Sequence, residues 1–488
     1  MSRRGSKQVA ELGTGLIYIP GSEPVIEACD RWIDVIEIEP QTFWSKTQSD
    51  SSPYRNNLDR LAWVRSLDKA KLLHGVGNPL GGTLSLDFDQ FPAFREFADA
   101  FQPSWVSEHL SFNRASDGGQ VFSTGFFLPP LQTHEVAAVC AENIRKFQDS
   151  VRLPAAFETG VKYISKQKAE MPDGAFFRAV AEQADCAILL DLHNLWTNQC
   201  NGGYQVLEVL SQLPLERVWE IHLAGGEEIG GCWIDAHSGL VPAGLMRITE
   251  NVVRRLPNLK AVIFEIMPQH IHAKNLDLGQ IADHLHWMHD VWETRGTVIS
   301  GGDCQDLPIV PDATSSQDSI CLSGRSWENA VGRLVVGKEA DSNLEQALQA
   351  DPGIDVFRNL VMSIRGGTLQ EVLPLTCRYI ILESGQPQFR QFIQSYCCRA
   401  LPSLFPSDEA RNFVGHLRRS QIGIKHLLEI AEFELAGIEA ELGLNPGAVR
   451  FTCNPDLLLA ALAAGELPRN LPQEEIELTV IRQSHVPQ

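Results

Sequence analysis

The sequence predicts an α/β protein, a (β/α)8 TIM barrel followed by a smaller, mostly α-helical domain. Three observations support this fold class. Short apolar runs recur every 20–50 residues up to about residue 300, longer amphipathic stretches separate them, and the pattern becomes helical after about residue 325. Near-continuous apolar strands that alternate with helical segments are typical of a parallel sheet covered by helices.

The strand-like runs number eight, which is the number of βα units that closes a TIM barrel. They are Gly15–Ile19, Val35–Glu39, Lys71–Gly75, Trp105–His109, Ala155–Glu158, Ala187–Asp191, Val218–His222 and Ala261–Glu265. Thr297–Ser300 is a spare ninth run, so the count is open by one. We therefore place the barrel domain at residues 1–302.

A second domain is expected at residues 326–488, after a linker at 303–325 that is rich in Pro, Asp and Ser. Apolar residues at i, i+3 and i+4 spacing predict its helices. The predicted helices are Asn343–Gln349, Asp355–Ile364, Leu375–Glu383, Gln388–Cys397, Ser407–Leu417 and Lys425–Leu442. Gly443 marks a plausible stop for the last of them.

Composition argues against several classes of function. The 488 residues include 41 Lys+Arg and 61 Asp+Glu, and the net charge of −20 would repel nucleic-acid phosphates. The 11 cysteines are scattered without a CxxC pair, which argues against a disulfide framework or a zinc knuckle. The chain has no run of about 18 apolar residues and no apolar signal at its start. We expect a cytoplasmic protein that binds neither nucleic acid nor membrane.

Potential metal ligands stand at the carboxyl ends of the strand-like runs. Five runs end in such a residue, and His74 lies one residue before the end of a sixth: the five are His109, Glu158, Asp191, His222 and Glu265. The carboxyl ends of barrel strands converge on one mouth, where the active sites of this fold lie. Asp235 and His237, between the last two runs, have i, i+2 spacing and add two more ligands.

This set supplies more ligands than one ion takes, so two or three metals are expected. Mixed imidazole and carboxylate ligation without thiolate suits iron or manganese, and also zinc. Any one of these residues alone would more often be a core or surface residue. Other acidic or imidazole groups are weaker candidates for metal ligands, and contacts to the ligands or purely structural roles fit them equally well: Glu37, Glu39, Glu108, His193 and Glu220. We expect His284, His286 and His289 to form a solvated helix face, and His270 and His272 a loop.

Several motifs in a fixed order resemble the multinuclear non-haem iron-dependent oxidative enzymes. They are Ser107–Ser111, Leu190–Asn194 with Asn198 after it, Ile221–Gly225 and Asp235–His237. The resemblance covers residues 10–300. It implies a xylose-isomerase-like barrel with two or three irons of mixed Fe(II)/Fe(III) valence and dioxygen as co-substrate. The implied substrate is a ribosomally synthesised precursor peptide, modified most often at Cys.

Carried over position by position, the resemblance assigns His74 and His109 to one iron and Glu158 to a bridge. Asp191, His222, Asp235, His237 and Glu265 would complete the cluster, with Asn194 and Ser107 as supporting partners. His109, Asp191 and His222 are the expected catalytic residues. The chain departs from the usual pattern at His193, at Gly226 and at Ile266–Pro268, which leaves the reaction outcome open.

The C-terminal region is similar, more loosely, to the helical domain of the partner proteins that recruit the precursor. The similar segments are Leu373–Tyr379, Phe389–Phe392, Leu427–Glu434 and Asn454–Leu459. The resemblance implies a fused recruiting domain, and an ordinary helical dimerisation domain is the alternative.

Two alternatives remain for the function of the whole chain. One is a divalent-metal isomerase or hydrolase barrel, and the other is a catalytically silent scaffold that presents the helical domain. Eight costly polar groups in one mouth argue against a scaffold.

Overall fold

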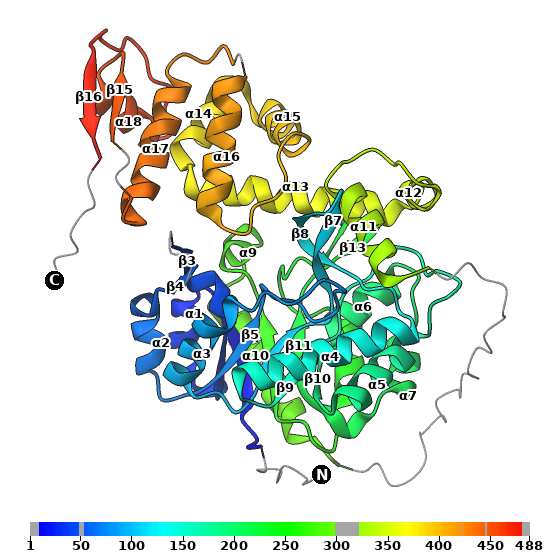
Figure 1. Cartoon of the computed structure of the whole chain (residues 1–488). Helices are drawn as coiled ribbons and strands as arrows, with labels where there is room; N and C mark the ends of the chain where they lie inside the picture. Colours follow the sequence, from blue (N-terminus) through cyan, green and yellow to red (C-terminus); the bar gives the residue numbers. More distant parts are fainter. Residues whose placement is uncertain (1–8, 48–52, 298–321, 421, 445–446, 481–488) are drawn as a thin grey trace. The chain divides into compact units, whose positions relative to one another are not determined.

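A computed structural model gives the fold of residues 9–47, 53–297, 322–420, 422–444 and 447–480. The chain forms two compact units (Figure 1). The first comprises residues 1–44, 50–113 and 127–328, and the second residues 45–49, 114–126 and 329–488. Within the described residues, no helix is both long enough and apolar enough to cross a membrane.

The first unit is a closed barrel of eight parallel strands among the described residues, which confirms the predicted fold class. The order around the barrel is β1-β14-β11-β10-β9-β6-β5-β2. The bounds are β1 (Gly13–Tyr18), β2 (Val35–Ile38), β5 (Ala70–Gly75), β6 (Val106–His109), β9 (Ala155–Glu158), β10 (Ala187–Asp191), β11 (Val218–Ala224) and β14 (Ala261–Glu265). Each strand coincides with one of the eight predicted runs. The possible ninth run, Thr297–Ser300, lies outside the described residues from position 298 onward.

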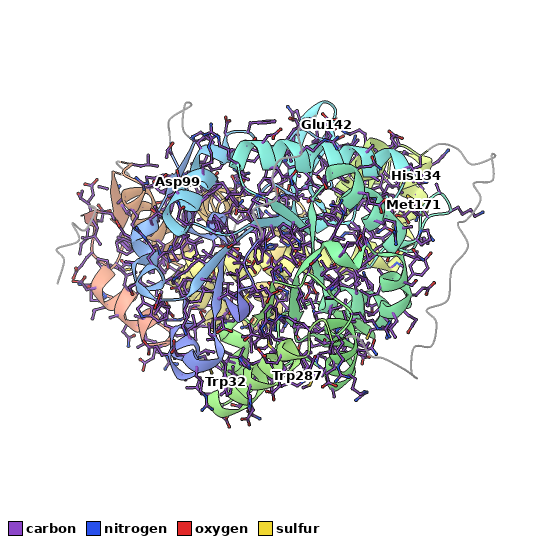
Figure 2. The ribbon with its side chains drawn as sticks, turned by 90° about the horizontal axis from the view of Figure 1, so that it is seen from below. Trp32, Asp99, His134, Glu142, Met171 and Trp287 are labelled. Carbon is purple, nitrogen blue, oxygen red and sulfur yellow. The ribbon has the colours of Figure 1, made fainter. Side chains whose placement is uncertain are left out.

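Helices surround this barrel, as Figure 1 shows for α3, α4, α5 and α10. Figure 2 marks His134 and Glu142 on α4, in this outer layer. The helices of the first unit are α1 (Glu23–Ala28), α2 (Ala62–Ser66), α3 (Gln90–Phe101), α4 (His134–Val151), α5 (Asp173–Ala184), α6 (Leu192–Cys200), α7 (Val206–Gln212), α8 (Ala243–Val253), α9 (Pro268–Ala273) and α10 (Leu278–Glu293).

Apolar side chains fill the interior of the barrel toward the amino ends of the strands. They include Leu72, Trp105, Ala156, Leu189 and Ile263, all at most 1% exposed. Because this floor is apolar and buried, it gives firm packing beneath the polar side chains that enter the barrel near the carboxyl ends of the strands. The floor therefore positions the residues at the mouth.

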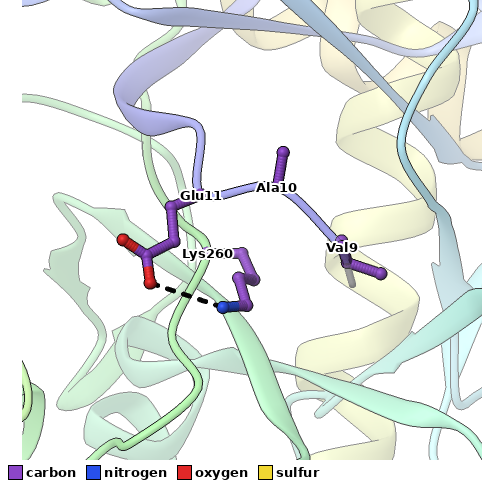
Figure 3. A pocket seen from close by; sticks show the side chains of 4 residues that line it. All are labelled: Val9, Ala10, Glu11 and Lys260. Atoms are coloured by element: carbon purple, nitrogen blue, oxygen red, sulfur yellow. Dashed lines mark hydrogen bonds and ion pairs between the residues drawn. The ribbon is translucent and has the colours of Figure 1, made fainter. Parts of the chain in front are cut away.

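A hollow of about 330 Å³ is shown in Figure 3. Its lining residues precede β1 and β14, so it lies at the amino ends of the strands. Val9, Ala10, Glu11 and Lys260 line it, and Glu11 Oε1 pairs with Lys260 Nζ at 3.5 Å. The active sites of TIM barrels lie at the opposite end, so this hollow is not a candidate active site.

Two imidazole-containing segments differ from their predicted structure. His270 and His272 lie in the short helix α9 rather than in a loop. His284 is only 5% exposed, packs against Phe264 and Trp287, and is not part of a solvated face. His284 and Met288 are four residues apart on α10, so they lie on the same buried face of the helix.

The second unit is mostly helical, as predicted, and its core surrounds Leu369, Ile380, Phe413, Ile430 and Phe451. It contains α12 (Asn343–Gln349), α13 (Pro352–Val372), α14 (Pro374–Ser384), α15 (Gln386–Cys397), α16 (Pro406–Arg419), α17 (Leu427–Glu441) and α18 (Pro455–Ala463), and most of α11 (Gly324–Val335). Gly443, just after α17, has φ +78°, in agreement with the predicted helix stop. The sequence did not predict α18 or the antiparallel ribbon of β15 (Ala448–Phe451) and β16 (Ile476–Thr479).

A hairpin from within the barrel sequence also belongs to the second unit. It consists of β7 (Phe112–Asp117) and β8 (Gln120–Leu128), joined at Gly118 and Gly119, both with positive φ. A Cβ at Gly332 would lie 2.6 Å from Ala115 Cβ, so the absence of a side chain there lets the hairpin approach α11. Asp117 accepts a hydrogen bond from Arg333 at 2.5 Å. Most of the predicted linker, residues 303–321, lies outside the described residues.

Candidate metal centre

The register of the barrel strands brings the predicted ligands side by side. His109 on β6 pairs with Glu158 on β9, and Asp191 on β10 pairs with His222 on β11. Glu265 on β14 stands opposite Ala224, two residues beyond His222. Parallel pairing of strands that carry a polar residue at or near the carboxyl end thus gathers these groups at one mouth; β11 runs two residues past His222, beyond the predicted end of its run.

Glu158 lies between two groups of imidazoles. Its Oε2 is 3.0 Å from His109 Nε2 and 3.4 Å from His74 Nε2, whereas its Oε1 is 4.0 Å from His222 Nδ1. Two groups of three side chains each bring their ligand atoms within 4.8 Å of one another. One group is His74, His109 and Glu158, and the other is Glu158, Asp191 and His222. The carboxylate of Glu158 is common to both groups.

Glu265 continues the chain of contacts to the segment after β11. Its Oε1 is 3.3 Å from His222 Nδ1, and its Oε2 is 3.3 Å from His237 Nε2. His237 Nε2 is in turn 3.2 Å from Asp235 Oδ1. Asp235 and His237 follow a short ribbon, β12 (Glu227–Ile229) and β13 (Cys232–Ile234). The structure therefore brings all eight sequence-predicted ligands into one continuous cluster.

Ser107 and Asn194, the two predicted supporting residues, contact the ligands directly. Ser107 Oγ lies 2.8 Å from His74 Nδ1, and its hydroxyl satisfies that ring nitrogen. The Asn194 amide donates to Asp191 Oδ2 at 2.9 Å and to Glu158 Oε1 at 3.3 Å. Asp191 is also the N-cap of α6, where its Oδ1 accepts from Asn194 N at 2.7 Å. One residue thus connects two ligands from neighbouring strands.

Several other side chains hold the cluster, and the sequence suggested some of them only weakly. Glu37, on β2, places its Oε2 2.9 Å from His222 Nε2, and His193 Nδ1 lies 2.9 Å from Asp235 Oδ1. Glu108 Oε1 lies 3.4 Å from His109 Nδ1, which is also 3.1 Å from the Gly75 carbonyl oxygen. Glu37 is a charged residue in the buried strand β2, and alternate residues of a strand point to the same face. A charged residue at an inward-facing position is the sequence signal that could have pointed to a role for Glu37.

Burial separates the cluster into a closed part and an open part. Asp191 and His222 are fully buried, whereas the side chains of His109 and His237 are 18% and 26% exposed. The ring of His109 stacks on Phe127 at a centroid distance of 4.0 Å. The open side of the cluster is therefore lined by two imidazoles and one phenyl ring.

Burial and neighbouring charges shift the pKa values of the acidic and imidazole groups in the cluster. Burial, with the charges of Glu158 and Glu265, raises the pKa of Asp191 well above its usual range. Burial alone would lower the pKa of His109, but Glu158 and Glu108 more than offset it and raise that pKa well above its usual range. Carboxylates packed this closely favour a bound cation, because a cation removes their mutual repulsion.

Unpaired polar atoms in the cluster provide a test of whether a metal fits. Within the residues that the structure describes, Glu158 Oε2 and both ring nitrogens of His222 are buried and lack a hydrogen bond of acceptable geometry. Such groups are costly to bury unless a partner satisfies them. Neutral imidazole nitrogen and carboxylate oxygen are both ligands for first-row metals, so the donor set fits a metal centre.

Comparison with known proteins agrees with this geometry. Residues 20–287 match the model of a family described as RiPP precursor modification enzyme MbnB/TglH/ChrH. A UPF0276 protein from Anaeromyxobacter sp. is 30% identical over 230 residues, which cover 47% of this chain and 80% of that protein. A UPF0276 protein from Streptomyces avermitilis is 29% identical over 252 residues, 51% of this chain, and is matched over half of its own length.

Solved structures with a similar arrangement include 3-keto-D-glucoside 4-epimerase, YcjR, from E. coli. It is 11% identical with a TM-score of 0.36, and the match covers 57% of this chain and 100% of that one. The matched family model spans more than half of the chain, over the strands that carry the cluster. This chain therefore belongs to the family of RiPP precursor modification enzymes MbnB/TglH/ChrH.

Proposed function

We propose that this protein is a multinuclear non-haem iron enzyme that uses dioxygen to oxidise a ribosomally synthesised precursor peptide at Cys residues. The observation that carries the proposal is the convergence of eight His, Asp and Glu side chains at the barrel mouth. The family description supports a precursor peptide as the substrate. The excess of ligands over the four to six that one ion takes supports more than one metal.

The eight proposed ligands would be shared between neighbouring iron ions. His74 and His109 would hold one iron, and Glu158, which faces imidazoles with both of its oxygens, would bridge. The other ligands would be Asp191, His222, Asp235, His237 and Glu265. Bound iron would supply one-electron chemistry with dioxygen and a Lewis acid for a substrate thiolate.

The protein's own contribution is to fix the ligands and to limit access to them. Ser107 and the Gly75 carbonyl orient the rings of His74 and His109, and Asn194 orients Asp191. Partners of this kind fix the ring orientation and raise the basicity of a ligand. The partly exposed edge at His109 and His237 is where a peptide would enter, while buried Asp191 and His222 would remain shielded from water.

We further propose that the second unit recruits the precursor peptide. Fusion of the two units would raise the effective concentration of a captured peptide near the barrel. A photo-crosslinking amino acid placed in the leader part of the precursor tests this in the full chain. We expect crosslinks to residues 329–480, and crosslinks confined to the barrel would contradict a recruiting role.

The activity is tested by co-expressing the full chain with each small reading frame next to its gene and measuring peptide masses. A mass change that requires iron and oxygen, and that disappears in His109→Ala, supports the proposal. An unchanged mass for every peptide, with iron-loaded protein in air, contradicts it. Purified components under argon and then air distinguish an oxygen requirement from an effect of the host cell.

A further inference from the structure

Asp235 and His237 differ from the other candidate ligands because no barrel strand holds them. They follow the ribbon β12–β13, and His237 has the unfavourable φ of +47°. Ligands on an irregular segment need fixed partners to keep a productive geometry. Two such contacts reach Asp235 from the barrel: Tyr163 Oη accepts from its backbone N at 3.0 Å, and His193 Nδ1 lies 2.9 Å from its Oδ1.

His193 is unusually well fixed for this contact. It is fully buried at the second position of α6, two residues after Asp191. Because a carboxylate oxygen can only accept, the Asp235 contact places a proton on His193 Nδ1. The opposite nitrogen, Nε2, has no hydrogen-bond partner in the described part of the chain. The contact with Asp235 is therefore the polar interaction that accounts for an imidazole at this position.

Gly226 provides the space for the His193 ring. A Cβ at position 226 would lie 2.8 Å from His193 Nε2, 2.6 Å from Trp233 Nε1 and 2.6 Å from the Ile234 carbonyl oxygen. Real Cβ atoms do not approach other atoms so closely, so any side chain at position 226 would displace the His193 ring, the Trp233 indole or the Ile234 carbonyl. Gly226 and His193 thus form one arrangement, in which the missing side chain of one accommodates the imidazole of the other.

We propose that His193 is a positioning residue for the metal centre, which orients Asp235 through its Nδ1–H and depends on Gly226 for its own placement. This inference rests on the proposed metal-dependent function. The hydrogen bond engages Oδ1 of Asp235 and leaves the second carboxylate oxygen for a metal ion. Loss of this type of partner typically lowers metal affinity 10- to 100-fold.

The test compares metal binding by His193→Leu, His193→Asn and the parent, each as the full chain. Asn places an amide donor near the position of Nδ1, so it should retain most of the affinity, whereas Leu fills the space without a donor. His284→Leu is the matched control, since it removes a buried imidazole that packs between Phe264 and Trp287. Gly226→Ala should also lower the affinity, because its Cβ would clash with both the His193 ring and the Ile234 carbonyl next to Asp235.

Binding of Fe(II), and of Zn(II) in parallel, is measured without oxygen by competition with a chelator and by elemental analysis. We expect a 10- to 100-fold loss of affinity for part of the bound metal in His193→Leu, and parent-like binding in His193→Asn and His284→Leu. Parent-like stoichiometry, affinity and Mössbauer spectrum in a folded His193→Leu overturn the inference. A parent protein that binds neither metal contradicts the proposed function itself, and the inference with it.

Discussion

His222 Nε2 lies 2.9 Å from Glu37 Oε2, and both side chains are fully buried inside the barrel. Nδ1 of the same ring faces Glu158 and Glu265, at 4.0 and 3.3 Å. A carboxylate that accepts from one nitrogen of an imidazole while the other binds metal is a recurrent feature of metal sites. Glu37 therefore lies in contact with a proposed ligand, and with Glu220 and His222 it forms a further group whose ligand atoms lie within 4.8 Å of one another.

Replacing Glu37 with Leu should weaken metal binding. The substitution removes the buried carboxylate that contacts the His222 ring, and we expect a 10- to 100-fold lower affinity for Fe(II) or Zn(II). Glu37→Gln retains an acceptor oxygen and serves as the control. Chelator competition under argon measures both variants, and equal affinities for Glu37→Leu and the parent would refute the role of Glu37.

Replacing a proposed ligand at the mouth should abolish peptide modification. His109→Ala removes an imidazole on the open side, and Asp191→Ala removes a buried carboxylate next to Glu158 and Glu265. His134→Ala changes an exposed residue on α4 and should leave modification unchanged (Figure 2). Mass spectrometry of the peptide gives the result. Complete modification by either ligand variant would show that the residue is not required.

Metal removal should destabilise the first unit. Burial and neighbouring carboxylates raise the pKa of Asp191, so the empty cluster carries unfavourable interactions that a cation relieves. A ligand present at 100 times its dissociation constant stabilises a protein by about 2.7 kcal/mol. We expect a lower Tm in EDTA and recovery on adding Fe(II) without oxygen. Identical melting curves in both conditions are incompatible with a metal centre in this cluster.

The buried imidazole of His284 should make the protein sensitive to acid. Burial lowers its pKa from 6.5 to about 4. Between these values the unfolded chain binds the proton and the folded chain does not, so stability falls as the pH drops from 6.5 to 4. The full effect is about 3 kcal/mol at 1.4 kcal/mol per pKa unit. Urea unfolding of His284→Leu should show a shallower pH dependence in this range, and an unchanged slope would exclude His284 as the cause.

In the second unit, removing one partner of the buried pair Arg365 and Glu409 should lower the stability strongly. Arg365 Nε donates to Glu409 Oε1 at 2.6 Å, and both side chains are at most 4% exposed. Arg365→Met leaves a buried carboxylate without its partner and should cost about 3–5 kcal/mol. Arg365→Met with Glu409→Leu removes both charges and should cost less. Calorimetry of the full chain measures both, and an equally large loss in the double variant would contradict this account.

The sequence predicted the barrel and most of the cluster because both follow from position along the chain. A buried parallel strand is a continuous apolar run, and a polar residue at or near its carboxyl end faces the mouth. His109, Glu158, Asp191, His222 and Glu265 could therefore be found without knowing which strands are neighbours. Position along the chain could not predict which of these residues contact one another. Those contacts depend on register, such as the pairing of Asp191 with His222.

Contacts across the barrel were harder to predict. Glu37 and His222 lie on β2 and β11, which are not adjacent, and only the closed geometry brings them together. The contact of His193 with Asp235 likewise joins α6 to an irregular segment. The hairpin β7–β8 did carry a local signal, because Asp117-Gly118-Gly119 between alternating residues is typical of a tight hairpin turn.

The metal content of protein purified without oxygen tests the central claim most directly. Elemental analysis gives the metals per chain, and Mössbauer spectra give the number and valence of the irons. We predict two or three irons per chain, with both ferrous and ferric signals. Zinc or magnesium alone, with no iron retained or taken up on reconstitution, would contradict the oxidative function and favour a barrel that catalyses hydrolysis or isomerisation.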